Sequence, residues 1–262
     1  MRFNEVLDTL RADGAFWVAD APESWGQGRT LFGGLQAALL VAAMREHIPR
    51  DIPLRSLQTT FVGPVMPGTV RISVQVLRQG KSAIHVQAQT VSEQGIGCTA
   101  LAVFGRARPS KIRIEPTYPV VRRGPEDSPT QRFVEGFSPQ FLNYVEQRWA
   151  SGNMPFTGGT EARTQIYVRY PGEAVTESLL IAIADTIPSP AISLLKTFAA
   201  ASSMTWTLEF LIDDFSTLPD AHWLMDAEVT AARDGYIYQT ATLWGADQRA
   251  VALSRQSAVV FG

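Results

Sequence analysis

The sequence predicts an α+β fold made of two similar halves, each a long antiparallel sheet wrapped around a central helix. Strand patterns separated by short turns occur in two blocks, and an apolar stretch of helical length precedes each block. Between the blocks lies PSKIRIEPTYPVVRRGPEDSPTQRFVEG, which holds five of the sixteen prolines and predicts a surface linker. We therefore expect an N-terminal repeat over residues 1–108, a linker over 109–136 and a C-terminal repeat over 137–262.

The strands of the first half show the clearest periodicity. In TVRISVQVL, Val70, Ile72, Val74 and Val76 alternate with polar residues, which is the period of a half-buried strand. The turn RQGKS leads to AIHVQAQTV, and the turn SEQG leads to GCTALAVFGRA. Short turns between long strands predict an antiparallel meander.

The second half repeats this order. HWLMDAEVTA is followed by the turn RDG, then by YIYQTATLW, the turn GADQ and AVALSRQSAVVFG. Each block also begins on an aromatic strand, LQTTF in the first half and TWTLEF in the second, and each ends on Val-Phe-Gly. The pattern therefore predicts a second meander like the first.

Three stretches are helix candidates. GGLQAALLVAAMREHIP is apolar nearly all round, which predicts a helix buried on every side. TESLLIAIADTIPSPAISLLKTF is its counterpart in the second half. A further helix is predicted for SPQFLNYVEQRWASG, with Ser138 as N-cap and Pro139 at the first helical position.

Composition excludes several classes of protein. Of the 262 residues, 45% are hydrophobic, and a net charge of −2 gives no electrostatic footprint for nucleic acid. No stretch reaches the roughly 18 uncharged apolar residues that a membrane span requires, and MRFNEVLDTLRADG has no signal-peptide core. Cys98 is the single cysteine, so no intrachain disulfide can form. We expect a cytoplasmic protein that binds neither nucleic acid nor membrane.

The sequence predicts neither a metal nor a cofactor. His47, His85 and His222 are scattered, and none has a partner at metal-ligand spacing. GIGCTA fits a dinucleotide-binding pattern, but a strand follows where a helix is required.

Two stretches are candidates for a functional site. In IAIADTIPSP, Asp185 ends an apolar run just before Pro188, and burying an ionised carboxylate costs several kcal/mol unless it is hydrogen-bonded. Asp185 is either a capping residue at a helix end or an acid that function requires inside. In SWGQGRTLFGG, Gly33 and Gly34 open the first apolar helix. They form either a tight turn or a cradle of free N–H groups for a carbonyl oxygen or oxyanion.

Several segments together resemble the acyl-CoA thioesterase II (TesB-like) family, whose fold is a double hotdog. The segments that resemble its first hotdog are LFGGLQAALLVAAMREHIP, LRSLQTTFVGPVMPG, VQVLRQGKSAIHVQAQTVSEQG and TALAVFG. Those that resemble its second are IADTIPSP, SSMTWTLEFL and LSRQSAVVFG. One departure is that the family often has Gln directly after the two glycines, whereas here Leu35 precedes Gln36.

The resemblance implies three catalytic residues. In that family a water held by an Asp, a Thr and a Gln hydrolyses the thioester, and these positions match Asp185, Ser203 and Gln256. Ser203 keeps the hydroxyl, although Thr205 is an alternative because residues two apart on a strand point the same way.

A second set of residues is expected to bind the substrate or its oxyanion, namely Gly33, Gly34 and Gln36. Gln36 lies 25 residues before Phe61, as Asp185 lies 25 before Phe210, so the two are candidate equivalent positions in a duplicated fold.

The expected function is hydrolysis of an acyl-CoA to free acid and CoA through an Asp-activated water, without metal or cofactor. A thiolate leaves readily because the pKa of its conjugate acid is about 8.5, so a base matters more than an acid. One alternative is a non-catalytic acyl-CoA-binding protein of the same fold. Another is a hotdog enoyl-CoA hydratase or dehydratase, which would pair Asp with His. Pairing of two chains as a homodimer is a further expectation, and the type of acyl chain stays open.

Overall fold

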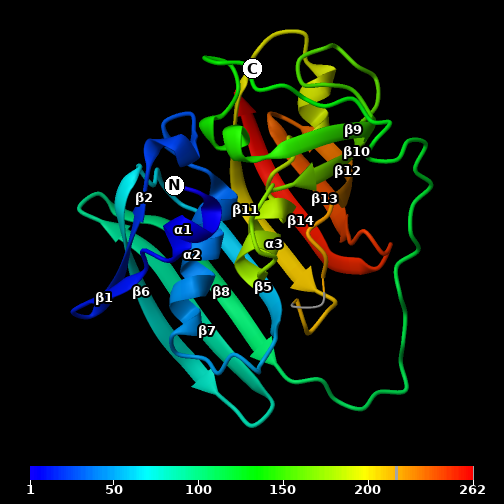
Figure 1. Ribbon diagram of the computed structural model, residues 1–262. Helices are drawn as coiled ribbons and strands as arrows, with labels where there is room; N and C mark the ends of the chain where they lie inside the picture. Colours follow the sequence, from blue (N-terminus) through cyan, green and yellow to red (C-terminus); the bar gives the residue numbers. More distant parts are fainter. Residues whose placement is uncertain (216–217, 262) are drawn as a thin grey trace.

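A large antiparallel sheet and a small two-stranded one form in the residues that the computed structural model describes, 1–215 and 218–261. Within them, twelve strands follow the order β1-β2-β6-β7-β8-β5-β11-β14-β13-β12-β10-β9. Figure 1 shows the first half of the chain at one end of this sheet and the second half at the other. Gly262, the last residue of the expected C-terminal repeat, lies outside the described residues.

The first half supplies the strands on one side of the centre. In chain order its elements are α1 (Phe3–Leu7), β1 (Arg11–Asp13), β2 (Phe16–Ala21), a 3-10 helix (Glu23–Trp25), β3 (Gly26–Gln27), β4 (Thr30–Leu31), α2 (Gly33–Arg45), β5 (Leu54–Phe61), β6 (Gly68–Gln79), β7 (Ala83–Ser92) and β8 (Gly95–Gly105). β3 and β4 pair only with each other. The meander predicted from period-two alternation is confirmed in β6, β7 and β8.

The second half supplies the remaining strands. In chain order its elements are a 3-10 helix (Gln140–Tyr144), β9 (Glu146–Ser151), β10 (Arg163–Arg169), α3 (Glu177–Ala184), a 3-10 helix (Pro190–Leu194), β11 (Ala200–Phe210), β12 (Trp223–Arg233), β13 (Tyr236–Trp244) and β14 (Ala250–Phe261). The second predicted meander is confirmed in β12, β13 and β14.

The two halves join where their aromatic strands lie side by side. β5 pairs with β11 in an antiparallel register, with Leu57 opposite Leu208 and Thr60 opposite Thr205. Both leucines are fully buried. The backbone hydrogen bonds of the sheet therefore continue from one half into the other without a break.

The two main helices pack against each other. α2 is buried along nearly its whole length, as its apolar sequence predicts, and lies against β6, β7 and β8 (Figure 1). α3 runs antiparallel to it, because Arg45 at the end of α2 donates a 2.8 Å hydrogen bond from Nε to Glu177 at the start of α3. At the other end, Gly34 lies against Ala182.

α3 is shorter than the apolar stretch around it. It begins after Thr176, whose hydroxyl accepts a 3.1 Å hydrogen bond from the Leu179 N–H, and it ends at Ala184. Pro188 is compatible with this end, because in a continued helix its ring would clash with the carbonyl of Ala184 and it has no N–H to donate.

The helix predicted over SPQFLNYVEQRWASG is wrong. Only a short 3-10 helix forms there, and the following residues make the strand β9. Ser138 caps no helix, since its hydroxyl accepts a hydrogen bond from the Val134 N–H. The side chains of Gln147 and Trp149 alternate with more exposed neighbours and are buried, so the two-residue period of a strand prevails over helix propensity.

The segment between the two halves covers one edge of the sheet. Residues 106–139, all of them described, form no helix and no strand, and Figure 1 shows much of this segment as a long loop outside the sheet. Near its end, Thr130 forms a β-bridge with Arg148. The Gln131 N–H donates to the Gln147 carbonyl, and the Trp149 N–H to that of Pro129, both at 2.9 Å. These bonds satisfy backbone groups that an edge strand would expose.

Among the described residues, no helix combines the length and apolar character needed to cross a membrane.

We expect Gly34→Ala to destabilise the fold, because a Cβ there would lie 2.5 Å from the buried Phe32 ring and 3.0 Å from the Ala182 Cα. Such overpacking costs about 1–3 kcal/mol, measurable by chemical denaturation. Gly124→Ala is the matched control, since a Cβ at Gly124 meets nothing within 4 Å. Its effect should stay within about 0.5 kcal/mol. Equal stability of the two variants would contradict a tight helix contact at Gly34.

Candidate active site

Asp185 directly follows α3, and its carboxylate is directed to the start of α2. By its backbone it is the C-cap of α3, where its N–H donates to the Ala182 carbonyl. Its side chain accepts a hydrogen bond from the backbone N–H of Gly34. Asp185 is therefore a cap by backbone position, while its acid group contacts the neighbouring helix.

The Gln256 amide joins the three residues expected from the family resemblance. Its Nε2 donates at 2.9 Å to Asp185 Oδ1 and at 2.9 Å to Ser203 Oγ. Ser203 comes from β11 and Gln256 from β14, strands that pair with each other. Residues separated by up to 71 positions in the chain thus meet at one point.

Thr205 does not share the direction of Ser203. The pairing of β11 with β14 shifts register between these two residues, so the strand carries a bulge there. The Thr205 hydroxyl forms its hydrogen bond with the Ser257 hydroxyl instead. The expectation that both hydroxyls point the same way is wrong, because a bulge breaks the two-residue alternation.

Burial changes the acid strength of Asp185. The residue lies deep among protein atoms, although part of its surface stays open to solvent. Desolvation raises the pKa of its carboxyl from 3.8 to about 7, against the opposing effects of the hydrogen bonds from Gln256 and Gly34. The carboxyl is therefore set to exchange a proton near neutral pH.

Cys98 lies near this acid but is not activated. Burial, with a smaller contribution from the Asp185 charge, raises the pKa of its thiol to about 12. A thiol with that pKa stays protonated at neutral pH and is a poor nucleophile.

The glycines at the start of α2 lie directly beside the acid. A Cβ at Gly33 would lie 2.8 Å from Asp185 Oδ2 and 3.0 Å from the Phe61 ring, so glycine permits both contacts. The Gly34 N–H, expected to bind a substrate oxygen, is donated to Asp185 in this structure.

Gln36 is not hydrogen-bonded to the acid. Its Nε2 donates 2.6 Å to the Leu31 carbonyl, and the residue is only 5% exposed. It lies in the first turn of α2, whereas Asp185 lies past the end of α3. Equal sequence spacing to Phe61 and Phe210 therefore does not give the two residues equal places in their helices.

Sequence reasoning missed Gln239. Its Nε2 donates a 2.9 Å hydrogen bond to Gln256 Oε1 from the neighbouring strand β13. The signal was present in YIYQTATLW, because the inward positions there include the buried Ile237 and Leu243. A glutamine on an apolar strand face needs a polar partner inside the protein.

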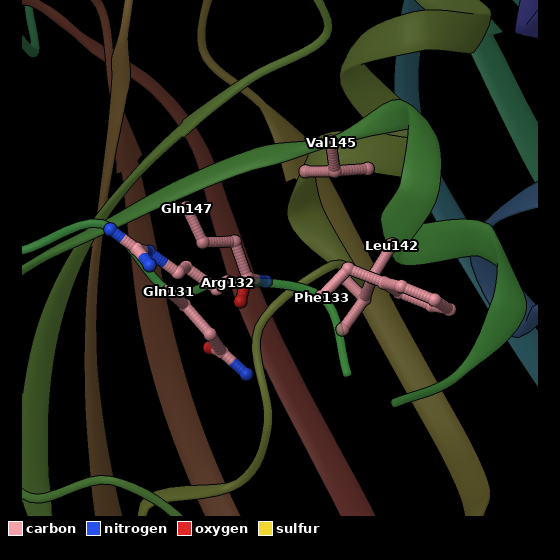
Figure 2. Close-up of a pocket in the computed structure, with 6 residues that line it drawn as sticks. All are labelled: Gln131, Arg132, Phe133, Leu142, Val145 and Gln147. Atoms are coloured by element: carbon pink, nitrogen blue, oxygen red, sulfur yellow. The ribbon is translucent and has the colours of Figure 1, made fainter. Parts of the chain in front are cut away.

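Gln147 contacts Thr186, the residue that follows Asp185 in the chain. Its Nε2 donates a 3.1 Å hydrogen bond to the Thr186 carbonyl. Gln147 also lines the pocket of Figure 2, together with side chains from residues 131–133 and from in and just after the 3-10 helix Gln140–Tyr144. The volume of this pocket, about 10 Å³, is close to the space of one water, so an acyl chain does not fit there.

The three histidines make their contacts away from Asp185. His47 accepts a 3.2 Å hydrogen bond from Trp17, His222 lies 3.4 Å from Glu146, and His85 lies on β7 opposite Val103. Within residues 1–215 and 218–261, no three side chains of His, Cys, Asp or Glu are grouped as metal ligands.

Family models match both halves of the chain. Residues 125–260 match the acyl-CoA thioesterase C-terminal domain, and residues 21–105 match the acyl-CoA thioesterase N-terminal domain. No curated protein matches the sequence.

Solved structures show the same fold. A hot dog fold protein from Alicyclobacillus acidocaldarius is 24% identical, with a TM-score of 0.89 over 99% of this chain and 98% of that one. The acyl-CoA thioesterase II TesB2 from Mycobacterium marinum is 15% identical, with a TM-score of 0.78 over 99% and 98%. The tesB protein of Mycobacterium avium subs paratuberculosis is 17% identical, with a TM-score of 0.79 over 99% and 100%. The predicted double hotdog is confirmed.

We expect Asp185→Asn to change how stability depends on pH. Between the ordinary pKa of 3.8 and about 7, folded wild-type protein keeps a proton on Asp185 that the unfolded chain has lost. This contribution is fully present below about pH 4 and is lost as pH rises to about 7. The melting temperature of the wild type, minus that of the variant, should therefore fall over this range. The corresponding change in the free energy of unfolding amounts to a few kcal/mol at most, because water reaches part of Asp185.

Asp20→Asn is the control for this titration. Hydrogen bonds from the Thr69 hydroxyl and Arg11 lower the pKa of Asp20, so its carboxyl is ionised throughout the range from about pH 5 to 8. The corresponding difference in melting temperature should be constant there. A constant difference in melting temperature for Asp185→Asn as well would mean that Asp185 ionises with the ordinary pKa of an aspartate.

Proposed function

The chain belongs to the acyl-CoA thioesterase family, and we propose that it hydrolyses an acyl-CoA thioester to a free acid and CoA. One observation carries the proposal: a single amide, that of Gln256, bonds both the acid Asp185 and the hydroxyl of Ser203 at the start of a helix. An acid with a raised pKa, held by fixed donors, has the properties of a general base.

Asp185 is the base in this proposal. Its ionised carboxylate accepts a proton from a water, and the water oxygen attacks the thioester carbonyl carbon. The tetrahedral intermediate then breaks its carbon–sulfur bond, and the sulfur leaves as a thiolate. The proton on Asp185 passes to that sulfur, which restores the carboxylate and releases CoA as a thiol.

Ser203 and Gln256 have different parts in this step. Two hydrogen bonds from one amide nitrogen use both hydrogens of Gln256 Nε2, so Gln256 orients the acid and the hydroxyl rather than the water. Ser203 Oγ accepts one of these bonds, and its own O–H remains to donate to the water. Asp185 and Ser203 together hold the water.

The start of α2 receives the negative charge that develops on the carbonyl oxygen. The first N–H groups of a helix have no partner within it, and the helix dipole places positive charge there. Gly34 already donates to Asp185. We therefore assign the oxyanion to the N–H of Gly33, the first residue of the helix.

Experiment can distinguish two alternative functions from the proposed hydrolysis. A non-catalytic acyl-CoA-binding protein would bind the thioester without releasing thiol. An enoyl-CoA hydratase or dehydratase of this fold would pair its acid with a histidine, and no histidine in the described residues is hydrogen-bonded to Asp185.

We expect thiol release from at least one member of a panel of acyl-CoAs, followed with a thiol reagent. Asp185→Asn should lower kcat by about 100- to 10,000-fold, the contribution of a general base. In the wild type, kcat/KM should fall as pH drops below about 7, because Asp185 then becomes protonated. Calorimetry should show that the variant still binds acyl-CoA. Binding by the wild type without thiol release would favour the non-catalytic alternative.

Ser203→Ala and Thr205→Val test which hydroxyl acts. Ser203→Ala leaves the Gln256 amide without one acceptor and the water without one partner. We expect kcat to fall about 10- to 100-fold, which corresponds to roughly 1–3 kcal/mol. Thr205→Val should leave kcat within about 3-fold of the wild type, because among the described residues the Thr205 hydroxyl is hydrogen-bonded to that of Ser257 and not to the acid. The reverse order of effects would refute the assignment of Ser203.

A further inference from the structure

We infer that Gln239 is a positioning residue, which holds the Gln256 amide so that its nitrogen faces Asp185 and Ser203. The inference follows from the hydrogen-bond geometry around Gln256, and its activity readouts rest on the proposed function. No motif of the sequence drew attention to this residue.

The direction of an amide depends on its neighbours, because its two ends have similar shapes and opposite hydrogen-bonding character. Gln256 donates from Nε2 to Asp185 and Ser203, and its Oε1 accepts from Gln239 Nε2 at 2.9 Å. If the amide turned over, Oε1 would face a carboxylate and Nε2 would face the Gln239 nitrogen. Both contacts would lose their hydrogen bond.

Gln239 matters most while Asp185 carries a proton. As a carboxylate, Asp185 only accepts hydrogen bonds and by itself keeps Gln256 Nε2 facing it. Once protonated, Asp185 can donate, so its preference for Nε2 disappears. At that stage the donor on Gln239 still fixes Gln256 Oε1 and keeps the bond to Ser203 in place.

The position of Gln239 suits this role. It lies directly opposite Gln256 on the neighbouring strand, so the two side chains lie on the same face of a hydrogen-bonded sheet. A side chain on a strand is held more rigidly than one on a loop.

The surroundings of Gln239 do not otherwise favour an amide. The residue is 7% exposed, and its face of β13 includes the buried Ile237 and Leu243. Its Oε1 is buried and accepts no hydrogen bond from the residues that the structure describes. Burying such an oxygen is unfavourable, so an apolar side chain would suit the fold better. Its bond to Gln256 gives the amide a reason to be there.

Gln239→Leu removes the donor at nearly constant volume, and Gln239→Met is a second variant with a more adaptable side chain. Gln165→Leu is the matched control, because Gln165 is a buried strand glutamine (4% exposed) bonded to Ser151 and the Val120 carbonyl. For either Gln239 variant we expect kcat to fall up to about 100-fold, with KM nearly unchanged. The acidic limb of the kcat/KM profile should move to higher pH, because without the Gln239 donor the protonated acid can donate to a turned Gln256 Oε1, which favours the protonated form. Gln165→Leu should change neither.

Stability separates positioning from a structural role. We expect the Gln239 variants to melt close to the wild-type temperature, because they remove the buried Gln239 Oε1 but leave Gln256 Oε1 without its donor. A lower melting temperature together with an unmoved acidic limb would overturn the inference. Unchanged kcat in both variants would also overturn it.

A readout that does not require activity keeps the inference separate from the proposed function. In protein labelled with ¹³C at aspartate carboxyls, the Asp185 signal is identified by its loss in Asp185→Asn. Its titration should shift to higher pH in Gln239→Leu or Gln239→Met and stay in place in Gln165→Leu. An unshifted titration overturns the role of Gln239 even if the wild type hydrolyses acyl-CoA. A shifted titration in a protein that hydrolyses none supports that role and removes the proposed function.

Discussion

The contact between the Asp185 carboxylate and the start of α2 is the interaction on which the remaining structure depends. An ionised acid inside a protein is unfavourable by several kcal/mol unless donors surround it. Here the donors are the Gly34 N–H and the Gln256 amide, and the positive end of the α2 dipole adds to them. This arrangement requires the two helices to approach closely, which Gly34 permits because it has no side chain at Ala182. The groups that surround the Asp185 carboxylate therefore come from both halves of the chain.

At the opposite ends of the same two helices, a pair of charged side chains holds the helices together. Arg45 in the last turn of α2 bonds Glu177 in the first turn of α3, and both side chains are about seven-eighths buried, at 13% and 12% exposed. Each charge also has the sign that its own helix dipole favours. The antiparallel helix pair is thus fixed at both ends. The site end, in contrast, combines a helix terminus with a lone acid, so its charge responds to pH.

Much of the fold could be predicted from the sequence, and less of the site. Period-two alternation identified the strand around Val74, and the repeated order of strands and turns identified the strand in YIYQTATLW. The helix expected over EQRWAS failed, since pairing with β10 on one side and residues 129–131 on the other is a tertiary effect. Asp185, Ser203 and Gln256 came from family resemblance, and their hydrogen bonds join distant segments. The bulge before Thr205 and the bond from Gln239 depend on strand register, which local sequence does not encode.

Sealing the β9 edge with residues 129–131 has a consequence for the protein in a crowded solution. A long open sheet can recruit strands from other molecules at each end and grow without limit. At the far end, β1 is only three residues long, each of them exposed, and it takes part in the ion pairs Arg11–Asp20 and Asp13–Arg71. One border is thus covered and the other is short and charged. Both discourage strands of other molecules from adding to the ends of the twelve-stranded sheet.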